Sequence, residues 1–278
     1  MFVFKTVNVL RSMAALFQYD FMWHALLAGA IIALLAGVVG FFVVLRQQSF
    51  ATHALSHIGF AGACAGILLS VNPLWGQLLL TLMAAGLMAI MPDKMERKDT
   101  VIGLVLAFAL GLGSLFLFLA NDFAGSASHI LFGDLFSVSS ASLWLMALLS
   151  MISLVVLAMM AKGLWLSSLL PEIAAARGLA LKKINVVFFM VLSVAITLTS
   201  QAVGILLIFT LLVGPPAMAL QWTGCFWRGL ALSVALNIGF VCLALVIAAM
   251  SNWPLSFCLS ALVFGSYSLL WGFGNRTC

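Results

Sequence analysis

Residues 22–45 read MWHALLAGAIIALLAGVVGFFVVL, an unbroken apolar run of 24 residues without a charged side chain. A transmembrane α-helix needs about 20 such residues to cross the hydrocarbon core of a bilayer. The whole chain has the same character, because 65% of its 278 residues are hydrophobic and only 7% are charged. An ordinary soluble domain carries about 25% charged residues, so this chain has too few to cover an aqueous fold. The sequence therefore predicts an all-α, polytopic bundle of transmembrane helices.

We expect eight or nine spans in one transmembrane domain, residues 22–278. The predicted spans are residues 22–45, 51–71, 74–91, 100–121, 141–161, 184–200, 203–220, 229–250 and 255–273. Residues 1–21 are predicted to lie in the membrane interface as an N-terminal segment. The alternative is that this segment also crosses the membrane, which would add one span to the nine ranges above and make their number even. Arg11 interrupts the apolar core that a cleaved signal peptide needs.

Lysine and arginine are confined to alternate connections between these spans. They stand at Arg46, at Lys94, Arg97 and Lys98, from Lys162 to Lys183, at Arg228 and at Arg276. The remaining connections, around Asn72, at 121–140, around Gln201 and around Asn252, contain neither residue. The positive-inside rule places the charged connections and the C-terminus in the cytoplasm. Lys5 and Arg11 are the exception, because they precede a span that begins outside.

The segment ATHALSHIGFA, residues 51–61, carries two of the four histidines of the chain, His53 and His57. A spacing of four residues puts both imidazoles on one face of a helix, with Cβ atoms about 6 Å apart. Neutral imidazole binds zinc, copper, iron and nickel, so the two rings are candidate ligands for one metal ion. The alternative is that the rings lie at the membrane interface or bond to a backbone carbonyl.

The segment GLWLSSLLPEIAAARGLALKK, residues 163–183, is too polar in its middle to be a span. Pro171 can open a helix, Glu172 favours its positive end, and Gly178 is a typical C-terminal stop. We therefore expect a surface helix of about two turns on the cytoplasmic side. It is either an interfacial connector or a docking helix for a cytoplasmic partner.

Two further segments carry candidate functional residues. Residues 201–220 contain Gly204 and the triplet Gly214, Pro215 and Pro216, which predicts a broken helix because both prolines lack an N–H donor. Broken helices at membrane depth often line a transport path, and the alternative is a kink that serves packing alone. The outer connection 121–140 holds His129 and Asp134, which are additional candidate metal ligands, although a lone histidine in a loop is more often structural.

Other residue classes exclude some functions. The five cysteines are scattered without a CxxC pair, which indicates buried thiols and no zinc knuckle. No basic stripe with interleaved aromatics is present, so nucleic-acid binding is not expected. No GxxxxGK[ST] loop is present either, so the chain cannot bind ATP through such a loop.

Four segments together resemble the permeases of zinc- and manganese-type ABC importers. They are SFATHALSH (49–57), LFGDLFSVS (131–139), LLPEIAAARGLALKKIN (169–185) and VGILLIFTLLVGPPAMA (203–219). They occur in the order and spacing of that family, and the resemblance covers residues 22–272.

The resemblance implies a multi-pass subunit of the bacterial cytoplasmic membrane that works with partners. These are a cytoplasmic ABC ATPase, an extracytoplasmic metal-binding protein, and a second copy of the permease in a membrane-embedded homodimer. It implies ATPase coupling through the segment with Pro171, Glu172, Ala175, Ala176 and Gly178. No stably bound cofactor is expected, only a transported divalent metal.

Two positions depart from the family pattern. His53 stands where the family usually has aspartate, whereas His57 matches the family histidine. A nitrogen ligand in place of a carboxylate oxygen favours zinc, although manganese and iron stay open. Leu170 stands where the family often has an aspartate before the proline.

Two other classes of protein are alternatives. Histidines four residues apart are typical of HExxH metalloproteases, but Ala54, Leu55 and Ser56 separate this pair and supply no general base. An ion-coupled secondary transporter usually carries charged residues within its spans, and these spans are nearly free of them.

Overall fold

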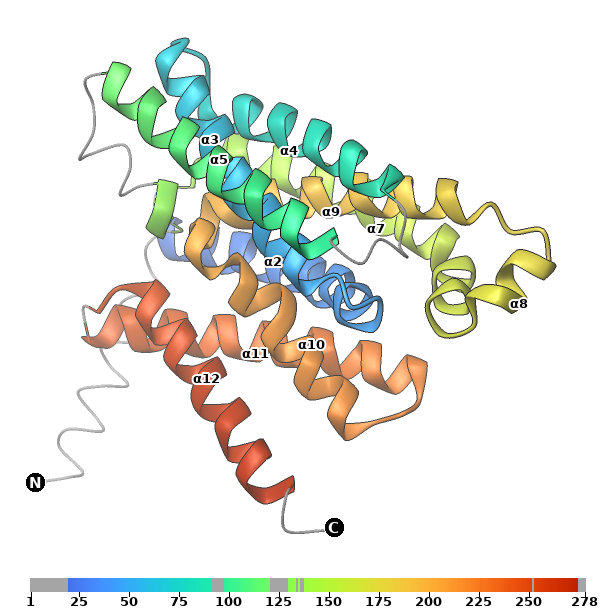
Figure 1. The fold of residues 1–278 in the computed structure, drawn as a ribbon. Coiled ribbons are helices and arrows are strands. Elements are labelled where there is room, and N and C mark those ends of the chain that lie inside the picture. The colour runs from blue at the N-terminus through green and yellow to red at the C-terminus, as the bar shows by residue number, and fades with distance from the viewer. Residues whose placement is uncertain are drawn as a thin grey trace, which may run out of the picture.

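The computed structural model describes residues 20–91, 98–120, 130–133, 135, 138–251 and 253–274. In these ranges the chain is helical and contains no strand, as predicted. The helices are α2 (Asp20–Leu45), α3 (Ser49–Leu68), α4 (Pro73–Ile90), α5 (Lys98–Leu119), α7 (Ser140–Leu169), α8 (Pro171–Ala176), α9 (Leu181–Val203), the 3-10 turn η2 (Ile205–Leu207), α10 (Ile208–Trp222), α11 (Phe226–Ser251) and α12 (Leu255–Gly274) (Figure 1).

Eight of the described helices are long and apolar enough to cross a membrane. The ninth predicted span corresponds to α12, whose apolar part, Leu255–Leu270, is shorter. The expectation of eight or nine spans is therefore confirmed. The interfacial segment predicted for residues 1–21 falls outside the described residues, except that α2 already begins at Asp20.

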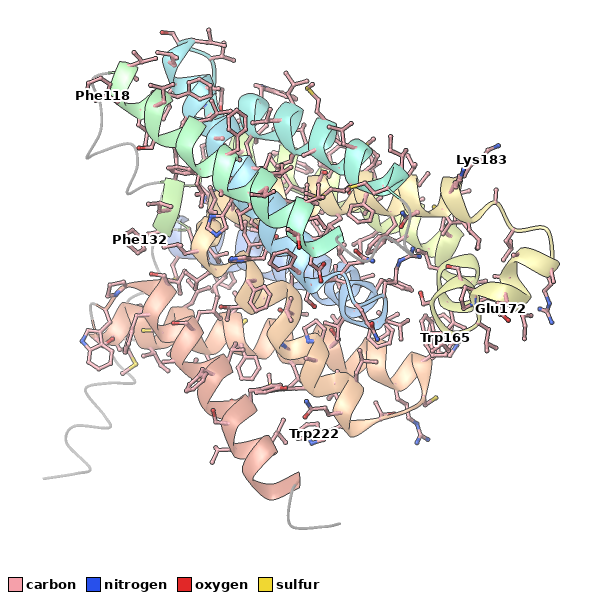
Figure 2. The ribbon with its side chains drawn as sticks, in the orientation of Figure 1. Phe118, Phe132, Trp165, Glu172, Lys183 and Trp222 are labelled. Carbon is pink, nitrogen blue, oxygen red and sulfur yellow. The ribbon has the colours of Figure 1, made fainter. Side chains whose placement is uncertain are left out.

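The interior of the bundle is formed by α2, α3 and α9, which are mostly buried, whereas α5 and α7 expose most of their surface. Side-chain hydrogen bonds join α4 to α9, for example Gln77 Nε2 to Ser200 Oγ at 2.5 Å and Asn185 Nδ2 to the Ala89 carbonyl at 2.7 Å. In Figure 1, α12 diverges from the bundle, and α8 projects at the far end of α7. Glu172 and Lys183 lie at the end that carries α8, and Phe118 and Phe132 lie at the opposite end (Figure 2).

The helix break is at Gly204, not at the triplet Gly214, Pro215 and Pro216, so that part of the sequence prediction was wrong. α10 runs through both prolines without ending. Pro216 has no N–H to donate to the Leu212 carbonyl, and Gly40 of α2 packs its backbone against this carbonyl and the Pro216 ring. Helix packing therefore holds the proline-containing turn straight enough to continue.

At Gly204 the backbone adopts a φ of +81°, which a side chain would disfavour, and η2 follows. The backbone of Gly133, with a φ of +68°, lies directly against it. A Cβ on either glycine would collide with the backbone of the other segment. The outer segment around Gly133 is thus packed onto the junction between α9 and α10.

Candidate metal site and docking helix

The two histidines predicted as ligands lie side by side near the beginning of α3. The ring centroids of His53 and His57 are 4.6 Å apart, with the ring planes at 86°. Both side chains are half-buried, and His57 Nδ1 is buried without a hydrogen-bond partner among the described residues. The hydroxyls of Thr52 and Ser56 donate to backbone carbonyls one turn earlier and so satisfy the local helix, not the rings. An unpaired buried ring nitrogen is costly unless something binds it.

The pair lies deeper in the bundle than its place near the cytoplasmic end of α3 suggests. The His53 ring packs edge-on against Phe209, with centroids 5.6 Å apart. Phe209 lies in the first turn of α10, about 20 Å along the helix from Trp222 at its cytoplasmic end. The beginning of α3 therefore meets the beginning of α10, which the charge pattern places on the outer side. This contact could not be predicted from the sequence, because it depends on the angle at which the two helices cross.

No third ligand joins the pair within the described ranges. Those ranges contain no group of three or more His, Cys, Asp or Glu side chains that could hold a metal ion. His129 and Asp134, the other predicted ligands, lie outside the described residues. The described part of the site therefore offers two imidazole nitrogens, a set suited to brief binding.

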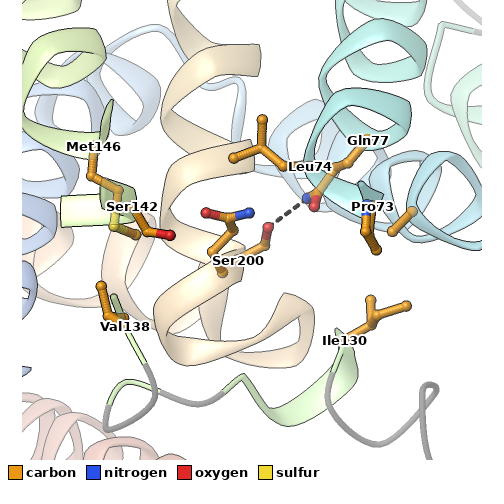
Figure 3. Close-up of a pocket in the computed structure, with 10 residues that line it drawn as sticks. Pro73, Leu74, Gln77, Ile130, Val138, Ser142, Met146 and Ser200 are labelled. Carbon is orange, nitrogen blue, oxygen red and sulfur yellow. Dashed lines mark hydrogen bonds between the residues drawn. The ribbon is translucent and has the colours of Figure 1, made fainter. Parts of the chain in front are cut away.

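A second polar feature lies at the outer end, where a cavity of about 240 Å³ opens between α4, α7 and α9. Figure 3 shows Gln77 and Ser200 on one side and Ser142 and Met146 on the other. Ile130, from the segment before Gly133, also lines it. Its amides and hydroxyls carry no charge, so no charge pattern in the sequence indicates this cavity.

The predicted surface helix is present as α8, Pro171–Ala176. It ends in a Schellman motif, because Gly178, at a φ of +75°, donates its N–H to Ala175 and Leu179 donates to Ala174. Of its six residues only Ala174 is buried. The exposed residues include all the α8 positions predicted from the sequence: Pro171, Glu172, Ala175 and Ala176. Ile173, which the sequence did not single out, is 45% exposed. The helix therefore offers a small, mostly apolar surface next to one acidic residue.

Comparison with known proteins identifies the family. A model described as "ABC 3 transport family" matches residues 18–267. The chain is 28% identical to the manganese import system permease protein ScaB of Streptococcus parasanguinis, over 87% of this chain and 86% of that protein. It is 29% identical to the high-affinity zinc uptake system membrane protein ZnuB of Haemophilus influenzae, over 73% of this chain and 78% of that protein.

Among solved structures, the fold matches a chain of PsaBC from Streptococcus pneumoniae in complex with a Fab. The TM-score is 0.82 and the match covers 94% of both chains, at 23% sequence identity. At this identity the likeness establishes a shared fold. The family match covers most of the chain, and it agrees with the motifs and the helical bundle. The chain therefore belongs to the ABC 3 transport family, as the multi-pass membrane permease subunit of a bacterial-type ABC transporter.

Proposed function

We propose that this permease imports a divalent metal ion across the bacterial cytoplasmic membrane, and that the ion is zinc. The observation that carries the proposal is the pair His53 and His57, whose rings meet inside the bundle and leave one buried ring nitrogen unpaired. A path for ions must bind them well enough to admit them and weakly enough to release them. Two imidazole ligands meet this requirement better than a closed four-ligand site, which would retain zinc.

Energy would come from a separate ABC ATPase that docks on α8, and the ion from an extracytoplasmic metal-binding protein. The metalloenzyme alternative is disfavoured because it needs a general base beside the pair. The Ser56 hydroxyl donates to the Thr52 carbonyl, and Ala54 and Leu55 have no acid–base group. The direct test is uptake of radioactive zinc by proteoliposomes that contain the permease, the ATPase and the binding protein. Uptake that does not depend on ATP would contradict the proposal.

The choice of zinc rests on the imidazole at position 53. Relatives in this family are named for both manganese and zinc, so the ligand type has to decide. Two nitrogen donors favour zinc over manganese by the Irving–Williams order, and carboxylate oxygen favours manganese. Iron lies between the two in the same order. Selection by the binding protein can add to this preference.

The preference predicts the effect of restoring a carboxylate. In the variant His53→Asp, the ratio of zinc uptake to manganese uptake is expected to fall about tenfold, which corresponds to about 1.4 kcal/mol. Both metals are measured in the same proteoliposomes with the native ATPase and binding protein. An unchanged ratio would show that His53 does not set the preference.

A second copy of the permease would complete the path. Phe209, which contacts His53, also lines a groove of about 760 Å³ between α10 and α12. Phe257 and Phe264 line the same groove from α12, and Phe264 is 74% exposed. Lipid cannot cover a path for a cation, because a charge in hydrocarbon is costly. We therefore place the two-fold partner against this face, which closes the groove beside the histidines.

This arrangement predicts a cross-link between copies. In a chain whose native cysteines are replaced, Phe264→Cys is expected to give mostly dimers with a short bifunctional thiol reagent in the membrane. Met159→Cys is the matched control, because Met159 is 83% exposed on α7, away from the groove. Equal cross-linking of the two variants would contradict an interface at α10 and α12.

A further inference from the structure

Arg46, at the end of α2, joins the two helices that hold the docking helix. Its Nη2 donates to Asn185 Oδ1 of α9 at 2.9 Å, and its Nη1 lies 3.4 Å from Ser167 Oγ of α7. The guanidinium carbon also lies 5.0 Å from the ring centroid of Phe188. Ser167 comes four residues before Pro171, where α8 begins. Asn185 lies in the second turn of α9, the helix that follows α8. The Arg46 side chain thus contacts both helices that flank α8, namely α7 and α9.

The contacts of Arg46 differ from those of an ordinary cytoplasmic anchor. Arginine at the end of a span usually extends toward water and lipid headgroups. Here the guanidinium faces Phe188 and Asn185, which are 0% and 6% exposed. Asn185 is itself fixed, because its Nδ2 donates to the Ala89 carbonyl of α4. Arg46 is itself half-buried, and a partly desolvated cation on a network of this kind is costly unless its hydrogen bonds are well placed.

The backbone that follows Arg46 leads directly to the histidines. α2 ends in a Schellman motif in which Gln47, not glycine, adopts a φ of +56°, and Gln48 donates its N–H to the Val43 carbonyl. The Gln48 carbonyl then accepts from the N–H and the hydroxyl of Thr52, beside His53. A left-handed conformation at a non-glycine residue is strained and persists only when surrounding contacts hold it. The backbone N–H groups of Arg46, Gln47 and Gln48 all donate to carbonyls of α2, so the turn 46–48 is a short, hydrogen-bonded link between α2 and α3.

We propose that Arg46 is a positioning residue that transmits movement of the docking helix to the helix carrying His53 and His57. A push on α8 moves the end of α7 and the beginning of α9, and Arg46 is bonded to both. The turn 46–48 converts this movement into a shift of the first turns of α3. The two imidazoles then change position relative to Phe209. The proposal rests on the proposed function, because it assumes that an ATPase acts on α8.

The test compares the amount of zinc imported with the amount of ATP hydrolysed. In proteoliposomes with ATPase and binding protein, Arg46→Gln is expected to keep ATP hydrolysis within about twofold and to lower zinc uptake by more than about tenfold. Asn185→Ala is expected to have the same effect, since it removes the same bond. Arg46→Lys keeps the charge but cannot reach both partners as a planar fork, so intermediate uptake is expected. Arg228→Gln is the control, because Arg228 is an exposed cation on the same side.

The outcomes separate the possible failures. If Arg46→Gln and Asn185→Ala import as much zinc per ATP as the native permease, the proposal is overturned. A merely structural role predicts that ATPase association, hydrolysis and uptake all fall together, and this result would also overturn it. If Arg46→Gln does not accumulate in the membrane, the same ratio measured for Arg46→Lys decides. Absence of ATP-dependent uptake by the native complex would instead refute the proposed function.

Discussion

Replacing His57 or His53 by alanine is expected to lower zinc uptake by more than about tenfold, with the larger loss at His57. The reason is that the two rings are the candidate metal ligands that meet in the described interior of the bundle. His57 carries the buried nitrogen without a partner, so it contributes a lone pair or a donor that the protein itself does not use. Uptake is measured with ATPase and binding protein present, after normalisation to the amount of permease in the membrane.

The matched control for these variants is His24→Ala. His24 belongs to α2, and its Nε2 lies 3.1 Å from Ser140 Oγ, far along the chain from the pair. Its loss is expected to change uptake less than about twofold, in line with substitutions outside a functional site. If His53→Ala and His57→Ala both import zinc at the native rate, neither ring contacts the ion on its way through.

The local signals in the sequence were sufficient to locate the surface helix α8 but not the helix break. Pro171 and Gly178 act within their own segment, through a fixed φ and a left-handed turn, so their positions alone locate α8. The break was expected at Pro215 and Pro216 for an equally local reason. It occurs at Gly204 because the backbone around Gly133, about 70 residues away along the chain, packs against it. A contact between such distant segments leaves no periodic pattern in the sequence.

In the candidate site, contacts within one helix were predictable from the sequence, whereas contacts between helices were not. The spacing of His53 and His57 along one helix fixes their proximity, and the structure confirms that their rings meet. The contact of His53 with Phe209 depends on how α3 crosses α10, and helix crossing angles follow from packing of whole surfaces. Arg46 was visible only as one of the charges that orient the chain. Its hydrogen bond to Asn185 exists because the end of α2 lies beside the beginning of α9, a contact between residues 139 apart in the chain.

Two acidic substitutions on α8, the proposed docking helix, are Ala175→Glu and Ala176→Glu, and together they are expected to abolish ATPase binding and zinc uptake. Both alanines are exposed, so the substitutions should change the stability of the permease by less than about 0.5 kcal/mol. The neighbouring Ala174 is fully buried and is left unchanged. Two new carboxylates beside Glu172 place three like charges on a helix of six residues, at a surface that a partner has to desolvate. Copurification of the ATPase with tagged permease is expected to fall more than tenfold, about 1.4 kcal/mol or more.

The control adds the same charge elsewhere on the cytoplasmic side. Gly224 and Cys225 lie exposed in the turn between α10 and α11, and a Cβ at Gly224 meets no atom within 4 Å. The double variant Gly224→Glu with Cys225→Glu should therefore retain both the ATPase and most of the uptake. If the α8 variant still copurifies with the ATPase and imports zinc, the ATPase docks on another surface. If it retains the ATPase but loses uptake, α8 transmits force without providing the binding energy, because rigid helices can carry displacement through contacts that contribute little affinity.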